Sequence, residues 1–157
     1  MTWTEWIEWG AKIIGALGTG AGVLIAAVSY RNQTKIKRAE WLKSLFEKFF
    51  ENPTYKEVRG WLDYGGLHEK LLVEDETQRH INEEKFTDFL NFFEFIGVLY
   101  SRDQLIFDEV YEVFDYYLKK IDTDEDCRRW MDEYSFEKLK GLLVPMPAAI
   151  RKRQKKQ

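Results

Sequence analysis

The sequence predicts an all-α membrane protein, in which a single N-terminal transmembrane helix continues into a cytoplasmic multi-helix bundle. Three observations predict this class. Residues 13–30 form an uncharged run of eighteen residues, apolar side chains then recur at helical spacing, and the chain contains three Pro and ten Gly. We expect an interfacial segment and transmembrane helix at 1–30, an α-helical domain at 31–144 and a basic tail at 145–157.

The predicted membrane span reads IIGALGTGAGVLIAAVSY. Its length is near the lower limit for crossing a hydrocarbon core about 30 Å thick. Trp6 and Trp9 precede it and Tyr30 closes it, as expected of aromatic residues at the two interfaces. The two alternatives are a cleaved signal peptide, which the acidic residues before the span argue against, and a buried helix of a soluble core.

The charges on either side of the span predict its orientation. The N-terminal side carries Glu5, Glu8 and a single Lys12, whereas four basic residues follow the span: Arg31, Lys35, Lys37 and Arg38. Basic residues concentrate on the cytoplasmic side of membrane helices. We therefore expect the N-terminus outside, a single pass, and the helical domain in the cytoplasm.

Small residues crowd the span, and they predict contacts between membrane helices. Gly18 and Gly22 form one pair at four-residue spacing, and Ala16 and Gly20 form a second pair on another face. Small side chains let helices approach closely in lipid. The residues expected at these contacts are Gly15, Ala16, Gly18, Gly20, Gly22 and Ala26. A helix with two such faces can contact two neighbouring copies, as a homo-oligomeric ring or pore requires. The alternative is a lone membrane anchor.

Seven helices are expected after the span, and Pro145 and Pro147 are expected to end the fold. Asn52-Pro53 suits the start of the second helix, and Gly65-Gly66 suits its end. The helix at 82–100 is the most apolar: one apolar stripe runs from Phe86 to Tyr100 and is widened by Phe95. Gly97 lies in this stripe and predicts a close helix crossing. The expected ranges are 31–52, 53–64, 67–73, 82–100, 106–121, 125–134 and 136–143.

The charge pattern argues for a membrane surface as partner and against nucleic acid. Residues 39–150 carry 25 acidic and 14 basic side chains, although the whole chain has a net charge of −3. A nucleic-acid binder needs a continuous basic face. Basic side chains near both ends are expected on anionic lipid, and a solvated tail is the alternative. In the tail these residues are Arg151, Lys152 and Arg153.

No catalytic motif is recognisable, so we expect neither an enzyme nor a cofactor or metal site. His68 and His80 have no metal-binding or nuclease spacing, and each is expected on the surface or at a cap. The acidic run at 122–126 lacks the glycine and terminal Glu of a calcium loop. The single cysteine, Cys127, excludes an internal disulfide and fits a buried position.

Two stretches carry a resemblance to known proteins. They are KRAEWL at 37–42 with LFEKF at 45–49, and LNFFEFIG at 90–97 followed by FDYY at 114–117. This pattern resembles an uncharacterised bacterial family of small membrane-anchored helical domains, and it is similar to the membrane accessory proteins of type VI CRISPR systems. The similarity covers roughly residues 36–140.

The resemblance implies an oligomeric effector in the bacterial inner (plasma) membrane. Such an effector would act in anti-phage defence, by forming a pore or perturbing the membrane, with a trigger or protein partner on its cytoplasmic domain. The Arg-to-His motif of some of these relatives has no match here, which argues against a nuclease role. The alternative is a membrane-tethered interaction or regulatory module without pore activity.

Overall fold

The computed structural model describes Ser29 and residues 33–154, and the prediction of an all-α helical bundle is confirmed for them. They contain no strand. The chain divides into two units, residues 1–40 and 41–157. Within the described part, no helix combines the length and the apolar character needed to cross a bilayer. Apart from Ser29, the predicted span at 13–30 lies outside these residues.

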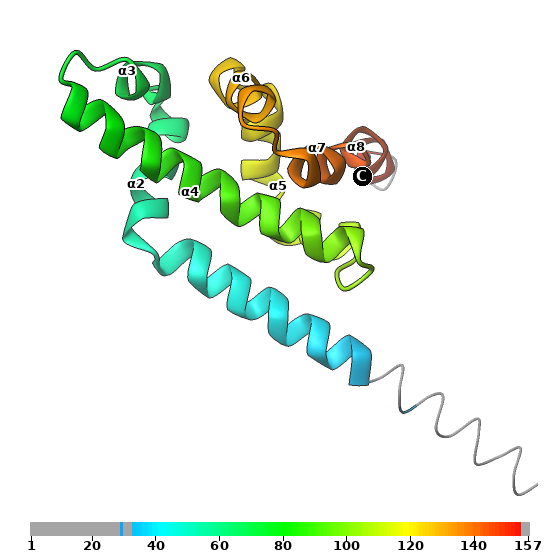
Figure 1. The fold of residues 1–157 in the computed structure, drawn as a ribbon. Helices are drawn as coiled ribbons and strands as arrows, with labels where there is room; N and C mark the ends of the chain where they lie inside the picture. Colours follow the sequence, from blue (N-terminus) through cyan, green and yellow to red (C-terminus); the bar gives the residue numbers. More distant parts are fainter. Residues whose placement is uncertain (1–28, 30–32, 155–157) are drawn as a thin grey trace, which may run out of the picture. The chain divides into compact units, whose positions relative to one another are not determined.

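Residues 33–51 are helical, and seven further helices follow (Figure 1). Polar caps fix several of the boundaries. Asn52 Oδ1 accepts hydrogen bonds from the N–H groups of Thr54 and Tyr55, and Gly65 ends that helix at a φ of 72°. The seven are α2 (Pro53–Tyr64), α3 (Leu67–Leu71), α4 (Glu76–Ser101), α5 (Phe107–Thr123), α6 (Glu125–Glu133), α7 (Glu137–Leu143) and α8 (Met146–Gln154).

Most helix ends lie within two residues of those expected, and two boundaries differ by more. Helix α4 begins six residues earlier than predicted, at Glu76, because Asp75 caps it by accepting from Thr77 N and Gln78 N. The two prolines do not end the fold. Helix α8 follows, with Pro147 in its first turn, where a missing N–H costs no helical hydrogen bond.

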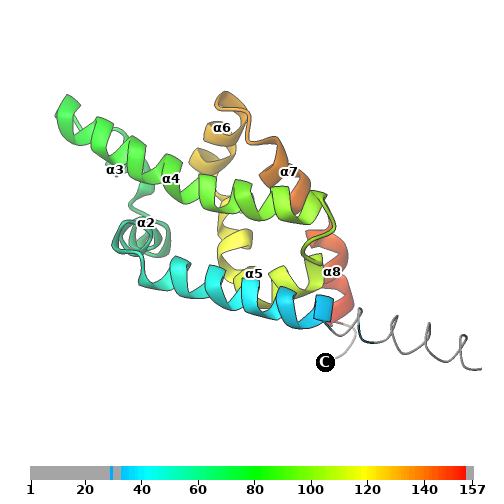
Figure 2. The ribbon, with the colours of Figure 1, turned by 60° about the horizontal axis from the view of Figure 1, so that its bottom comes forward.

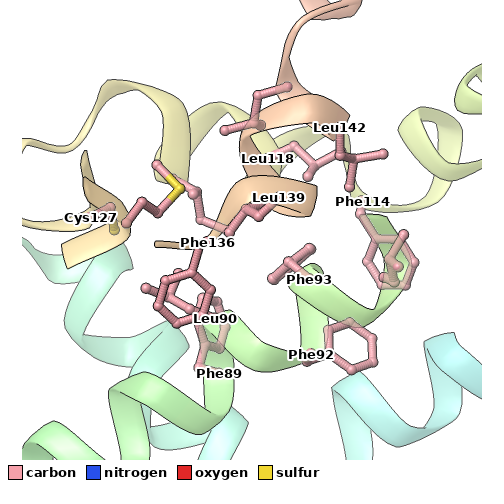
Figure 3. Packing of buried hydrophobic residues seen from close by; sticks show 14 of the residues in the cluster. Phe89, Leu90, Phe92, Phe93, Phe114, Leu118, Cys127, Phe136, Leu139 and Leu142 are labelled. Carbon is pink, nitrogen blue, oxygen red and sulfur yellow. The ribbon is translucent and has the colours of Figure 1, made fainter. Parts of the chain in front are cut away.

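The core of the second unit forms around α4, which lies alongside residues 41–51 in antiparallel direction (Figure 2). The predicted stripe of α4 is confirmed from Phe86 to Gly97, whereas Phe95 is exposed. Apolar side chains from α4, α5, α6 and α7 meet in one cluster, which includes Cys127 as expected (Figure 3). Burial raises the pKa of the Cys127 thiol, so it stays protonated.

The crossing of α4 and α7 brings two backbones together, as Gly97 predicted. A Cβ atom at Gly97 would overlap the carbonyl group of Lys138 and would lie 3.0 Å from Leu139 N. One turn earlier, Glu94 caps α7 from outside: its two carboxylate oxygens accept from Lys138 N at 3.0 Å and Leu139 N at 2.7 Å. The two helices therefore lie too close for a side chain at position 97, and the Glu94 carboxylate accepts from two N–H groups at the start of α7.

Candidate functional site

The candidate site lies where the helix of residues 33–51 ends, because two carbonyl groups there lose their usual partners. The carbonyl of Phe49 would normally accept from residue 53, but Pro53 has no N–H group. The carbonyl of Phe50 would normally accept from Thr54 N, which donates to Asn52 instead. The same turn that starts α2 thus deprives the preceding helix of two hydrogen bonds.

Arg59 replaces both missing donors. From the second turn of α2, its Nη1 donates to the Phe49 carbonyl at 3.1 Å and its Nη2 donates to the Phe50 carbonyl at 3.2 Å. Arg59 is only 7% exposed. A guanidinium suits this position because it offers several donors and places positive charge at the negative end of the helix dipole.

Aromatic rings complete the surroundings of the guanidinium. The Cζ atom of Arg59 lies 4.9 Å from the ring centre of Phe49, 4.5 Å from that of Phe50 and 5.9 Å from that of Tyr117. The ring faces attract the cation, and such contacts contribute up to about 2 kcal/mol when shielded from water. We call the five residues Phe49, Phe50, Arg59, Asp63 and Tyr117 the Arg59 clamp.

Asp63 and Tyr117 link the Arg59 clamp to α5. The hydroxyl of Tyr117 donates to Asp63 Oδ2 at 3.3 Å. Burial raises the pKa of Tyr117 to about 12, and the nearby Asp63 charge adds to this increase although Arg59 opposes it. Tyr117 is therefore a neutral hydrogen-bond donor at physiological pH. The Arg59 clamp therefore joins the helix end, α2 and α5.

Phe49 ties the Arg59 clamp to the aromatic core. Phe49 is completely buried and packs against Phe89, Phe93 and Phe114 at ring-centre distances of 5.4 to 5.7 Å. The Arg59 clamp holds no cysteine, serine or histidine that could act as a nucleophile or base. Among the described residues, no group of three His, Cys, Asp or Glu side chains is placed to hold a metal ion.

A second polar cluster joins α3 to α6 on the surface. His68 Nδ1 lies 3.1 Å from Asp126 Oδ2, and Arg129 pairs with the other carboxylate oxygen. Asp126 is buried, whereas His68 and Arg129 are exposed. Because a carboxylate only accepts, His68 donates this hydrogen bond from Nδ1. His68 is thus on the surface, as predicted, but with a partner 58 residues away.

Most of the predicted membrane-contacting residues fall outside the described part. The set expected at helix contacts, Gly15, Ala16, Gly18, Gly20, Gly22 and Ala26, lies there, and so do Trp6, Trp9 and Arg31. In the first unit, Lys35 and Lys37 are exposed and Arg38 is half-buried. In the second, Arg151 is exposed on α8, and Lys152 and Arg153 continue that helix.

The role of Arg59 was not predicted from the sequence, although a signal for it was present. A proline at position 53 removes the donor for the carbonyl four residues earlier, so some other donor had to be found. An arginine in the second turn of the next helix can reach back to that carbonyl.

Comparison with known proteins finds no relative: no family model, no curated protein and no solved structure matches this chain.

Proposed function

We propose that the protein is an oligomeric, membrane-anchored effector whose cytoplasmic helical domain controls the membrane helix. The observation that carries this proposal is the Arg59 clamp. It fixes Phe49 and Phe50, at the end of the helix of residues 33–51, to α2 and α5. In sequence, this helix follows the predicted span at 13–30. A trigger or protein partner that shifts α2 or α5 would therefore move the end of the helix that leads to the membrane.

The proposed assembly forms within the lipid. The small residues at the predicted helix contacts would pack against neighbouring copies, and two such faces per helix would allow a closed ring. Trp6 and Trp9 would lie at the outer interface, with the N-terminus outside the bacterial inner membrane. Arg31, Lys35, Lys37 and Arg38 would meet anionic headgroups on the cytoplasmic side. A pore or a membrane defect would then depolarise an infected cell.

The first test measures the mass of the full-length particle extracted in detergent. Gly18→Leu and Gly22→Leu should each reduce the particle to monomers, because a Leu side chain prevents close approach of two helices. Val23→Leu, a similar change at a position outside the small-residue pairs, should leave the mass unchanged. A wild-type chain that stays in the aqueous fraction as a monomer without detergent would rule out the proposal.

The second test asks whether the Arg59 clamp transmits the signal. On expression in bacteria with the trigger present, the wild-type chain should depolarise the membrane, as reported by a potential-sensitive dye. Arg59→Met should weaken depolarisation while the particle mass stays at the wild-type value. Equal depolarisation by wild-type and Arg59→Met chains at matched membrane levels would show that the helix end does not carry the signal.

A membrane-tethered interaction module without pore activity is the second candidate. Exposed aromatic side chains beside the Arg59 clamp favour it: Phe46 is 45% exposed and Tyr116 is 49% exposed. Such rings are typical of protein contacts. Replacing residues 13–28 by an unrelated Leu-rich helix separates the candidates, because a tether would keep its activity and a pore would lose it.

A further inference from the structure

A hollow between α4 and α6 has the lining of a site for a cationic peptide. It has a volume of about 380 Å³. We call it the α4–α6 hollow. Helix α4 contributes His80, Glu83, Glu84, Thr87 and Asp88, and α6 contributes Trp130 and Tyr134. The α4 residues follow helical spacing and therefore form one stripe, which faces two aromatic side chains four residues apart.

The aromatic side of the α4–α6 hollow is held in place by its own contacts. The indole Nε1 of Trp130 donates to Thr87 Oγ1 at 3.2 Å, and its ring packs edge-on against Phe86 at 5.5 Å. Tyr134 packs on Trp130 with ring centres 4.7 Å apart and is half exposed. Trp130 is thus oriented by the core, while Tyr134 offers its ring to a ligand.

The acidic side of the α4–α6 hollow lacks the counterions found elsewhere on the surface. Glu83, Glu84 and Asp88 form no ion pair with any described residue, whereas Lys85 on the same helix pairs with Glu57 at 2.7 Å. Glu84 and Asp88 are one turn apart, so their like charges repel. A positively charged group between them would relieve this repulsion.

Together these two sides select the chemistry of the ligand. A lysine or arginine side chain placed between Tyr134 and the carboxylates would gain attraction from the ring face and from the negative charges. An anionic lipid or a nucleic acid would be repelled. The open, elongated α4 stripe favours several basic residues in sequence over one small cation.

We propose that the α4–α6 hollow binds the basic C-terminal segment, residues 151–156, of a second copy of the chain. This segment has five basic residues out of six. Met146 and Ala149 are buried, so the start of α8 packs on its own core, whereas Arg151, where the basic segment begins, is exposed. The contact joins different surfaces of two copies, as the closed ring requires. The inference therefore rests on the proposed self-association.

Disulfide cross-linking of full-length chains in detergent tests this contact. One chain carries His80→Cys at the hollow, and a differently tagged chain carries Lys155→Cys. The two are mixed and oxidised. The native Cys127 is buried and should not compete. The mixed dimer should form, and an excess of a synthetic peptide of residues 149–157 should suppress it. A peptide with glutamine in place of every Lys and Arg should not.

Charge-neutral variants identify the residues responsible. Adding Glu83→Gln and Glu84→Gln to the His80→Cys chain should reduce the mixed dimer about fivefold at low salt, because two attractive charges are lost. The matched control, Glu69→Gln with Glu133→Gln, changes two exposed carboxylates outside the hollow and should leave the yield unchanged. Equal loss in both variants would show a general charge effect and overturn the proposal.

The particle mass, measured on the same samples, separates failure of this contact from failure of the proposed function. Oligomers without the mixed dimer would overturn the tail contact and leave self-association standing. Monomers without the mixed dimer would overturn both. A chain carrying both cysteines that cross-links only within itself would show that the tail fills its own hollow, which also overturns the proposal.

Discussion

Helix α4 makes two contacts of opposite kind. Toward residues 41–51 it presents aromatic rings, with Phe89, Phe92 and Phe93 all around Phe49. Toward α7 it presents a bare glycine and a carboxylate, and these meet backbone atoms of Lys138 and Leu139. Rings can rotate and repack after a substitution, but a backbone cannot. The α7 contact should therefore tolerate change less well than the contact around Phe49.

The largest effect is expected at the backbone contact. Gly97→Leu places a side chain where the carbonyl of Lys138 lies, so α7 must move away and lose both hydrogen bonds to Glu94. We expect a loss of about 4 kcal/mol or more in unfolding free energy, measured by chemical denaturation, since overpacking and lost capping act together. Gly141→Ala, with open space around its Cβ position, should instead stabilise α7 by about 0.5–1 kcal/mol.

Phe49→Ala tests the ring contact and should rank second. It removes a completely buried ring, and such truncations cost about 3–5 kcal/mol, with the lower end expected where neighbours collapse into the space. Phe46→Ala, at an exposed ring on the same helix, should cost less than about 1 kcal/mol. If Phe49→Ala destabilises the domain more than Gly97→Leu, the contrast between the two faces of α4 is wrong.

Arg59→Met should have the next largest effect, because two helix-end carbonyls lose their donors while the side-chain volume is nearly kept. Leaving these groups unpaired should cost about 2–3 kcal/mol by thermal or chemical denaturation. Arg59→Lys should recover part of this loss, since an ammonium keeps the charge but cannot bond both carbonyls as a fork does. Identical stability of the Met and Lys variants would mean that the charge contributes nothing.

The smallest effect concerns alkaline pH at the Arg59 clamp. Folding raises the pKa of Tyr117 from 10.0 to about 12, so the stabilisation from its neutral hydroxyl is fully present below pH 10. It should be lost as the pH rises through about 12. Tyr117→Phe should flatten the fall in melting temperature over this window. Tyr64→Phe, at an exposed tyrosine, should leave the dependence of melting temperature on pH as in the wild type. If Tyr64→Phe flattens this dependence as much as Tyr117→Phe does, the effect does not come from the Arg59 clamp.

Local patterns predicted much of the helical domain. Apolar spacing identified the stripe from Phe86 to Gly97, and Asn52-Pro53 with Gly65-Gly66 marked both ends of α2. These signals act over a few residues and depend little on the rest of the chain. The start of α4 was predicted six residues too late because apolar spacing does not reveal the helix cap that Asp75 forms.

Contacts between distant residues could not be predicted in the same way. Glu94 bonds backbone groups 44 and 45 residues away, and nothing in its neighbourhood distinguishes it from a solvated glutamate. The same holds for His68 and Asp126, whose meeting depends on how α3 and α6 pack. Arg59 was partly predictable. Pro53 shows from the sequence that the Phe49 carbonyl lacks its usual donor, but only the fold shows that Arg59 supplies one.

The hydrogen bonds from Arg59 to the carbonyls of Phe49 and Phe50 also affect how their helix frays. An ordinary helix frays at both ends, because its terminal groups lack partners. Here the C-terminal end is fastened by Arg59, so thermal opening of residues 33–51 should be least frequent near Phe49. Amide hydrogen exchange should then slow progressively along this segment, and the gradient should vanish when Arg59 is replaced.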